Sequence, residues 1–393
     1  MSQLELNNWK YKGACISGYY ADAFNNNYVY QTIDYLKKCG VNTIQIVVTW
    51  YQDEYNSNKI YKHKRKSIKD RDLIKIIEYI HKKGLKVNLN PHVDPIPNSN
   101  EWRAKIVPND VSAWFDNYKI FLAHFLQISI NNNIDLFTIG TEMVSMTRPE
   151  YYNYWSELVA FLKNYNNKSY KGKLTYIADK TEIFGMSRFF LGDNKVINVE
   201  VLNSRFWQLF DYISISAFYE VGNLKQSTPD INSVLESWNN KWIKKLEQWK
   251  NNLNIDKKVI IGEIGYRSVD CSHIAPALHY ETIESKEKYH FNQKIQENCF
   301  EGMFDGLINI DWIEGIFIWE EEINAPPVYY NKKNKKFSII NKGAAQIIAR
   351  YYRNNNVTDR IENIEIKQQE YKRNYFYRII RYVKWKFVKL FQG

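Results

Sequence analysis

Residues 28–49 read YVYQTIDYLKKCGVNTIQIVVT, and this stretch decides the fold. Its first part, Tyr28 to Cys39, has the apolar spacing of an amphipathic helix, and Gly40 follows as a residue typical of a helix end. Its second part, Thr43 to Thr49, is apolar and β-branched, as in a buried strand. A helix, a glycine and a buried strand together form the repeating unit of a parallel sheet covered by helices.

The same rhythm recurs over most of the chain. Ile68 to Lys83 reads as another helix, and Gly84 ends it. Eight such units favour a closed (β/α)8 barrel, the TIM barrel, over an open doubly wound sheet, and the sequence contains no glycine-rich phosphate-binding motif. The predicted strands are Gly13–Ser17, Thr43–Thr49, Lys86–Asn90, Leu136–Ile139, Leu174–Ala178, Tyr212–Ser216, Val259–Gly262 and Gly315–Trp319.

The barrel pattern ends near Arg353, so we predict one barrel domain over residues 1–353, a linker over 354–370 and a basic tail over 371–393. Much of the formal charge of +11 lies in this tail, which has seven basic and no acidic residues. Because the charge is concentrated at one end and no DNA- or RNA-binding motif accompanies it, we do not expect nucleic-acid binding.

The tail has the pattern of an amphipathic helix, which would form a short helical extension of the barrel. Its basic residues occupy the flanks of an apolar stripe, which favours a helix lying in an anionic membrane interface. Docking of the same helix on the barrel or on a partner protein is an equal alternative. The stripe consists of Ile379, Ile380, Val383, Phe387, Val388 and Phe391.

The N-terminal residues and the four cysteines argue for an intracellular address. Residues 1–12 lack the apolar run of a secretory signal, and no segment is apolar enough to span a bilayer. Cys15, Cys39, Cys271 and Cys299 are scattered without metal-ligand spacing, so we predict reduced thiols, no metal site and no cofactor. We therefore expect a cytoplasmic protein, peripheral at the inner membrane face if the tail binds lipid.

Two predicted strands end on a carboxylate. Residues 135–142 read DLFTIGTE and residues 258–263 read KVIIGE, so Glu142 follows the fourth strand and Glu263 the seventh. In a parallel barrel the carboxyl ends of all strands open onto one face, where active sites lie. Retaining glycosidases use two carboxylates that are held roughly 5 Å apart. Either glutamate alone is as readily a salt-bridge partner or a helix-start residue, and the pair carries the functional reading.

The chain resembles glycoside hydrolase family 113, whose known members act on β-mannan, within the clan of retaining (β/α)8 glycosidases. The resemblance runs from about Lys12 to Arg353. Its most specific pieces are Ile139-Gly-Thr-Glu142, Ile261-Gly-Glu-Ile-Gly-Tyr266, Asn90-Pro-His-Val-Asp94 with Trp102-Arg103, and Ile318-Trp-Glu320. The resemblance implies that Glu142 is the acid/base and Glu263 the nucleophile of a hydrolase acting on β-linked mannan or manno-oligosaccharides. The clan commonly has asparagine before the acid/base, where this chain has Thr141, and that difference leaves the identity of the sugar open.

Further strand ends supply a predicted sugar-binding set. The chain has 30 Tyr and 12 Trp, which suits stacking on sugar rings. For each member the alternative is a packing role, and Tyr219 is also expected to hydrogen-bond the nucleophile. Beside this set, the run Glu320 to Glu322 is typical of a solvated loop from which one carboxylate reaches substrate. The predicted substrate-binding residues are Trp50, His92, Asp94, Trp102, Arg103, Thr141, Tyr219, Trp319 and Glu320, with Tyr19 as a weaker candidate.

Three activities remain compatible with the sequence. Hydrolysis through a covalent glycosyl-enzyme intermediate is the leading hypothesis. A transglycosidase acting on a cell-surface glycan at the membrane uses the same intermediate, with a sugar hydroxyl in place of water. A barrel that binds carbohydrate without cleaving it is the third, favoured by Thr141 and disfavoured by the presence of both carboxylates.

Overall fold

The computed structural model describes residues 9–96, 102–165, 170–185, 201–223, 225–278, 289–323, 333–353 and 360–363, with the backbone alone at 189–190 and 196–197. The predicted tail, residues 371–393, lies outside these described residues. Among the described residues, no helix combines the length and apolar character that crossing a membrane requires.

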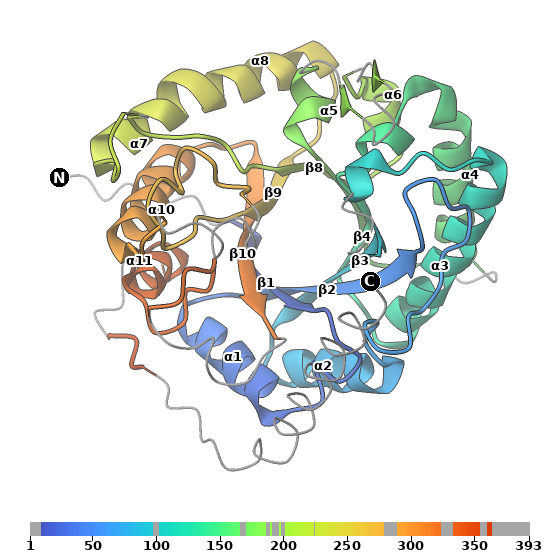
Figure 1. Cartoon of the computed structure of the whole chain (residues 1–393), viewed down its shortest axis with the longest axis horizontal. Coiled ribbons are helices and arrows are strands. Elements are labelled where there is room, and N and C mark those ends of the chain that lie inside the picture. The colour runs from blue at the N-terminus through green and yellow to red at the C-terminus, as the bar shows by residue number, and fades with distance from the viewer. Residues whose placement is uncertain are drawn as a thin grey trace, which may run out of the picture.

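Eight strands of the described residues form a closed parallel barrel in the order β1-β10-β9-β8-β5-β4-β3-β2. Figure 1 shows them around the centre of the molecule, with helices outside. A separate antiparallel pair joins β6 (Phe189–Phe190) to β7 (Val196–Ile197). The barrel strands are β1 (Tyr11–Gly18), β2 (Thr43–Gln52), β3 (Lys86–Pro95), β4 (Leu136–Thr141), β5 (Lys173–Ala178), β8 (Ile213–Ser216), β9 (Val259–Ile264) and β10 (Ile313–Glu322).

The helices form the outer layer (Figure 1). A π-helix at Trp238–Ile243 joins α7 to α8, and three 3-10 turns lie at Arg103–Lys105, Val144–Met146 and Pro149–Tyr151. The α-helices are α1 (Asn27–Lys38), α2 (Asp70–Lys82), α3 (Val111–Asn131), α4 (Tyr152–Lys163), α5 (Lys180–Phe184), α6 (Ser204–Trp207), α7 (Ile231–Ser237), α8 (Lys244–Leu253), α10 (Gln293–Leu307) and α11 (Gly343–Tyr352).

The first helix shows how local sequence sets these boundaries. The Asn26 side chain accepts hydrogen bonds from the backbone N–H groups of Tyr28 and Val29, which caps the start of α1. Gly40, just beyond its end, has φ +86°, a left-handed conformation that costs glycine little. Because the helix ends there, the chain can turn back into β2.

The barrel interior is layered. Side chains from strands on opposite sides of the barrel contact one another, so these side chains fill the barrel interior. The six buried residues of this cluster are Tyr11, Cys15, Leu136, Tyr212, Ile260 and Phe317. Above them, Thr138 donates to Asn88, Asn88 to Gln45, and Gln45 to the Gly262 carbonyl. This polar chain links β4, which precedes Glu142, to β9, which carries Glu263.

The predicted fold class is confirmed, since each predicted strand corresponds to a barrel strand and the helices alternate with them. The predicted glycines at the ends of α1 and α2 are also confirmed, because Gly40 and Gly84 follow these helices in left-handed conformations. All four cysteines are free, three of them are buried, and Cys271 is half-buried.

Candidate active site

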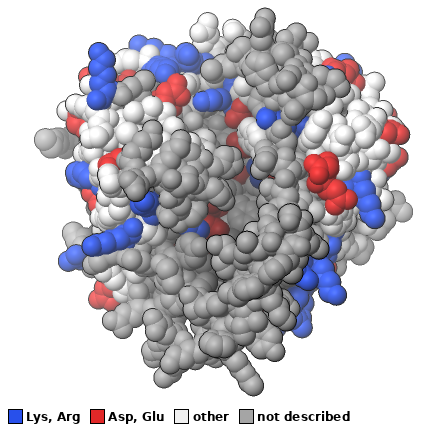
Figure 2. All heavy atoms as spheres, viewed as in Figure 1, with Lys and Arg blue, Asp and Glu red and all other residues white. Residues whose placement is uncertain are grey.

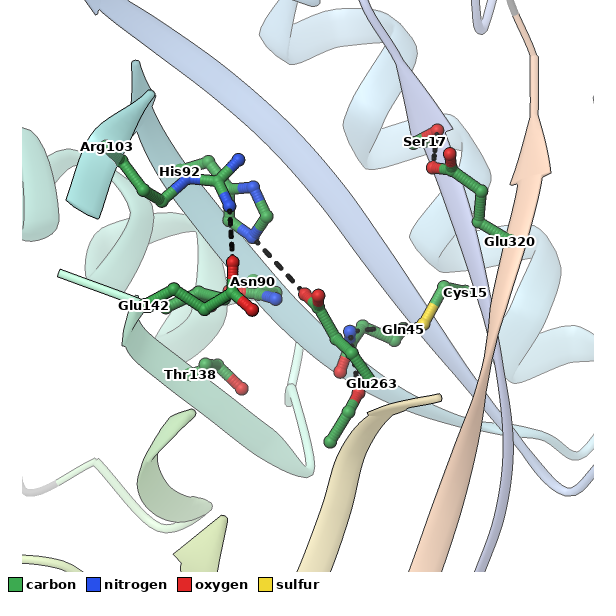
Figure 3. A network of polar contacts seen from close by, with 12 residues as sticks. Cys15, Ser17, Gln45, Asn90, His92, Arg103, Thr138, Glu142, Glu263 and Glu320 are labelled. Carbon is green, nitrogen blue, oxygen red and sulfur yellow. Dashed lines mark hydrogen bonds and ion pairs between the residues drawn. The ribbon is translucent and has the colours of Figure 1, made fainter. Parts of the chain in front are cut away.

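The two predicted catalytic carboxylates lie at the same end of the barrel. Glu142 directly follows β4, Glu263 lies near the end of β9, and their side chains are nearly inaccessible, with residue exposures of 8% and 2%. Figure 3 shows both carboxyl groups directed into one space between the strands. Figure 2 shows acidic side chains inside the hollow at the centre of the face that Figure 1 presents.

The backbone at Glu142 is held in an uncommon conformation. Its φ is +52°, in the left-handed region that residues with a Cβ seldom adopt outside functional sites. Its N–H donates to the carbonyl of Ile177 on β5, and the next N–H, of Met143, donates to the Tyr176 hydroxyl. These bonds fix the direction in which the Glu142 side chain leaves the strand.

Arg103 joins Glu142 to Asp94. Its Nε and Nη2 donate to the two carboxylate oxygens of Asp94, at 2.9 and 3.3 Å, which is a bidentate ion pair. Its Nη1 lies 3.6 Å from Oε2 of Glu142. A positive charge therefore lies beside the carboxylate of Glu142, as the dashed line in Figure 3 marks.

His92 faces the second carboxylate. Its Nε2 lies 3.8 Å from Oε1 of Glu263, beyond hydrogen-bond distance. Burial lowers the pKa of His92 well below its usual value, and the charge of Arg103 lowers it further. The imidazole is therefore neutral near pH 7 and acts as a polar group, without a charge.

Both carboxyl groups have raised pKa values. Burial raises the pKa of Glu142 to about 7, with the negative charge of Asp179 as a second cause, while Arg103 opposes the rise. Burial raises the pKa of Glu263 well above its usual range, and the charge of Glu142 raises it further. Because two neighbouring buried carboxylates resist joint ionisation, each gives up its proton less readily than an exposed carboxyl group does.

Two residues of this site were missed from the sequence. Asp179 directly follows β5 and raises the pKa of Glu142, whereas Ser216, the last residue of β8, hydrogen-bonds Glu142 and lowers it. Both stand at carboxyl ends of predicted strands, so the rule that found the glutamates also applies to them. Glu182, another buried acid nearby, instead caps α5 and accepts bonds from Thr147 and Tyr176.

The two predicted stacking tryptophans lie on different sides of the sheet. Trp319 packs against the cluster inside the barrel and remains partly exposed. Trp50 packs against the rings of Phe121, His124 and Phe125 on α3. The difference follows from strand alternation: Gln45 of β2 faces the interior, and a residue five positions later faces the opposite way. We therefore leave Trp50 out of the proposed sugar site.

Three further predicted residues occupy varied surroundings. Trp102 is half-buried immediately before Arg103, at the start of a 3-10 turn. Tyr19 follows β1, and burial raises its pKa well above the usual value, with the charge of Glu320 as a second cause. Tyr219 stacks on Trp242 with ring centres 4.2 Å apart, and its buried hydroxyl meets no hydrogen-bond partner among the described residues. The expected bond from Tyr219 to Glu263 is thus not formed.

The acidic run at Glu320 was expected in a solvated loop, and that prediction is wrong. All three glutamates belong to β10. Glu321 is 3% exposed and accepts bonds from the Ser338 hydroxyl and the Ile339 N–H, so it anchors the following segment. Glu320 accepts a bond from Ser17, and its charge adds to the raised pKa of Glu263. Glu320 is thus the member of the run whose charge acts on Glu263.

The described residues contain no group of three or more His, Cys, Asp or Glu side chains able to hold a metal ion. The charged groups of the site are Glu142, Glu263, Arg103 and Asp94, and the charges of Asp179 and Glu320 act on the two glutamates. What this arrangement can do is proton transfer and nucleophilic attack by a carboxylate inside a barrel mouth.

A TIM barrel with two buried glutamates, one after β4 and one on β9, is an architecture typical of glycoside hydrolases. The family model of Glycoside Hydrolase Family 113 matches residues 16–342. The chain belongs to this family. A comparison with curated proteins finds no match.

Solved structures share the fold. A Glycoside Hydrolase Family 113 β-1,4-mannanase in a complex has 23% identity and a TM-score of 0.69, covering 87% of this chain and 98% of its own. The family's β-mannanase from Alicyclobacillus acidocaldarius, in complex with ManMIm, has 19% identity, a TM-score of 0.70, and coverages of 90% and 99%. A β-glucuronidase from Ruminococcus gnavus, at 11% identity and a TM-score of 0.55, matches 87% of this chain over 50% of its own.

Proposed function

We propose that this protein hydrolyses β-mannosidic bonds of mannan or manno-oligosaccharides with retention of anomeric configuration. The observation that carries the proposal is the pair Glu142 and Glu263, buried at the same end of the barrel and electrostatically coupled. Similar family members are described as β-mannanases, which supports the choice of mannose.

The reaction has two steps. The Glu263 carboxylate attacks the anomeric carbon and forms an ester, while the proton of Glu142 passes to the leaving glycosidic oxygen. Water then attacks the same carbon, Glu142 takes its proton, and the ester bond to Glu263 breaks. In the second step a sugar hydroxyl in place of water gives transglycosylation.

The proposed roles require Glu142 to carry a proton and Glu263 to be ionised when the sugar is bound. The negative charge of Asp179 acts on Glu142 and favours its protonated form, as an acid requires. His92 faces Glu263 at 3.8 Å as a neutral polar group and adds no positive charge beside it. The positive charge of Arg103 opposes the rise of both pKa values.

The proposed choice of substrate depends on the residues around Glu142 and Glu263. Trp319, partly exposed inside the barrel, offers its ring to a pyranose face, and His92 and Arg103 offer polar hydrogens to hydroxyls. Trp102, Asp94, Thr141 and Glu320 complete the proposed contact set. We also propose that the tail, residues 371–393, attaches the protein to an anionic membrane surface.

Incubation with β-1,4-manno-oligosaccharides, followed by proton NMR of the first product, tests the reaction. We expect the β-anomer to appear first in the native chain, and Glu142→Gln and Glu263→Gln to lose at least about 1,000-fold in kcat. Glu157→Gln, an exposed glutamate on α4, is the matched control and retains activity. Initial α-anomer, or unchanged turnover in either catalytic variant, contradicts the proposal, and bound but uncleaved oligosaccharide identifies a non-catalytic barrel.

A further inference from the structure

In the side-chain amide of Asn90, on β3, only one of the two polar atoms has a hydrogen-bond partner among the described residues. The residue is fully buried, at 0% exposure. Its Oδ1 accepts a hydrogen bond from the Thr141 hydroxyl at 3.0 Å. Its Nδ2 is buried and meets no hydrogen-bond partner within the described part of the chain.

An amide N–H that is out of reach of solvent and of protein acceptors is costly, so folded proteins pair almost all such groups. The neighbouring amides in the barrel follow that rule, since the Nδ2 of Asn88 donates to Gln45 and the Nε2 of Gln45 donates to Cys15 and the Gly262 carbonyl. Asn90 lies one layer nearer the barrel mouth. Its donor is therefore available to a molecule bound in the barrel mouth.

Two contacts connect Asn90 to the surroundings of both glutamates. On one side, Asn90 holds Thr141, the residue before Glu142. On the other, His92 lies two positions along the same strand face and contacts Glu263 at 3.8 Å. In the view of Figure 3, the Asn90 amide nitrogen is drawn between the carboxyl groups of Glu142 and Glu263.

We infer that the Asn90 amide donates a hydrogen bond to the sugar hydroxyl on carbon 2, and that Thr141 positions it. This inference rests on the proposed function. The nucleophile must reach the anomeric carbon, so the hydroxyl on the adjacent carbon is the one that a group between the two carboxylates meets. Hydrogen bonds to that hydroxyl strengthen in the transition state of glycoside cleavage.

The bond to Asn90 explains why a threonine can stand before Glu142. Related barrels commonly place an asparagine at this position, and a threonine is too short to replace its reach and has one donor in place of two. Here the single Thr141 donor is spent on Oδ1 of Asn90, which orients the amide so that Nδ2 is the free end. The two residues together supply one oriented amide from β3 in place of one from β4.

The test compares an aryl β-mannoside with its 2-deoxy analogue, which lacks the hydroxyl in question. We expect Asn90→Ala to lower kcat/KM on the mannoside by about tenfold or more, the value of one hydrogen bond, and on the 2-deoxy analogue by less than about twofold. Asn117→Ala, on α3, is the matched control and leaves both values unchanged. Thermal melts verify that each variant is folded.

The positioning role has its own variants. Thr141→Val removes the bond to Asn90 and should lose activity on the mannoside far more than on the 2-deoxy analogue, whereas Thr141→Ser keeps the hydroxyl and should restore it. Equal losses on both substrates in folded Asn90→Ala, or no loss on either, overturn the inference. Failure of the proposed function looks different, because then the native chain cleaves neither substrate.

Discussion

The guanidinium of Arg103 places its Nη1 3.6 Å from Oε2 of Glu142. A positive charge at that distance favours the ionised carboxylate, yet burial and Asp179 still hold the pKa of Glu142 at about 7. The acid thus works close to neutral pH, where it is able both to give and to recover a proton.

The pH profile should report this balance. Because the acid must be protonated, kcat/KM of the native chain should fall as pH rises through about 7. Arg103→Gln removes the positive charge, raises the pKa of Glu142, and should move this basic limb upward by about one pH unit while lowering the maximum. Kinetics from pH 4 to about 10 measure it. An unmoved limb, or one moved to lower pH, contradicts the electrostatic role of Arg103.

Stability should increase when the buried charge is removed. The pKa of Glu263 is raised in the folded state, so its carboxyl is protonated there at pH values where the unfolded chain ionises, and stability is lost as pH rises. Glu263→Gln, neutral at every pH, should raise the free energy of unfolding at pH 7 by about 1 kcal/mol or more. The gain should vanish below about pH 4, where both states are protonated.

Denaturant unfolding at the two pH values measures this effect. Glu157→Gln on the exposed side of α4 serves as the control, and we expect no change from it. A catalytic variant that is less stable than the native chain at pH 7 would show that the carboxylate is better paired than the described contacts indicate.

Alanine variants of Trp319 and Trp50 should differ in effect, the first on substrate binding and the second on stability. Trp319→Ala removes the ring inside the barrel and should raise KM for manno-oligosaccharides by about tenfold. Trp50→Ala removes packing against α3 and should lower the free energy of unfolding by about 2 kcal/mol with KM unchanged. Steady-state kinetics and thermal melts of both variants decide it, and an elevated KM in Trp50→Ala would return that residue to the sugar site.

Membrane attachment is tested by deleting residues 371–393. The full chain should co-sediment with vesicles that contain anionic lipid, and less so as salt increases, whereas the truncated chain should remain in the supernatant. Equal sedimentation of both chains refutes the tail as the anchor. A lower melting temperature of the truncated chain with no vesicle binding by either chain identifies a helix docked on the barrel.

The fold was largely predictable because its signals are local. The helix of residues 28–39, its terminal Gly40 and the strand from Thr43 are neighbours in sequence, and eight repetitions of such a unit leave few ways to bury the strands. The positions of Glu142 and Glu263 follow from the same periodicity, since each stands where a predicted strand ends.

What the sequence could not supply depends on side-chain direction and on distant partners. Trp50 and Trp319 both stand near strand ends, and only the alternation of each strand, fixed by register, separates the outer from the inner one. The bond between Asn90 and Thr141 joins residues 51 positions apart. The burial of Glu321 depends on the later segment at Ser338, which no pattern within the acidic run reveals.

The most direct test of the account is to trap its intermediate. Incubation with a 2-deoxy-2-fluoro-β-mannosyl fluoride slows hydrolysis of the glycosyl ester, and mass spectrometry of the digested protein then locates the sugar. We predict one added fluoromannosyl group on the peptide that contains Glu263, and none in Glu263→Gln. A label on Glu142, or rapid turnover that releases the α-anomer with no label on either glutamate, would contradict the assignment.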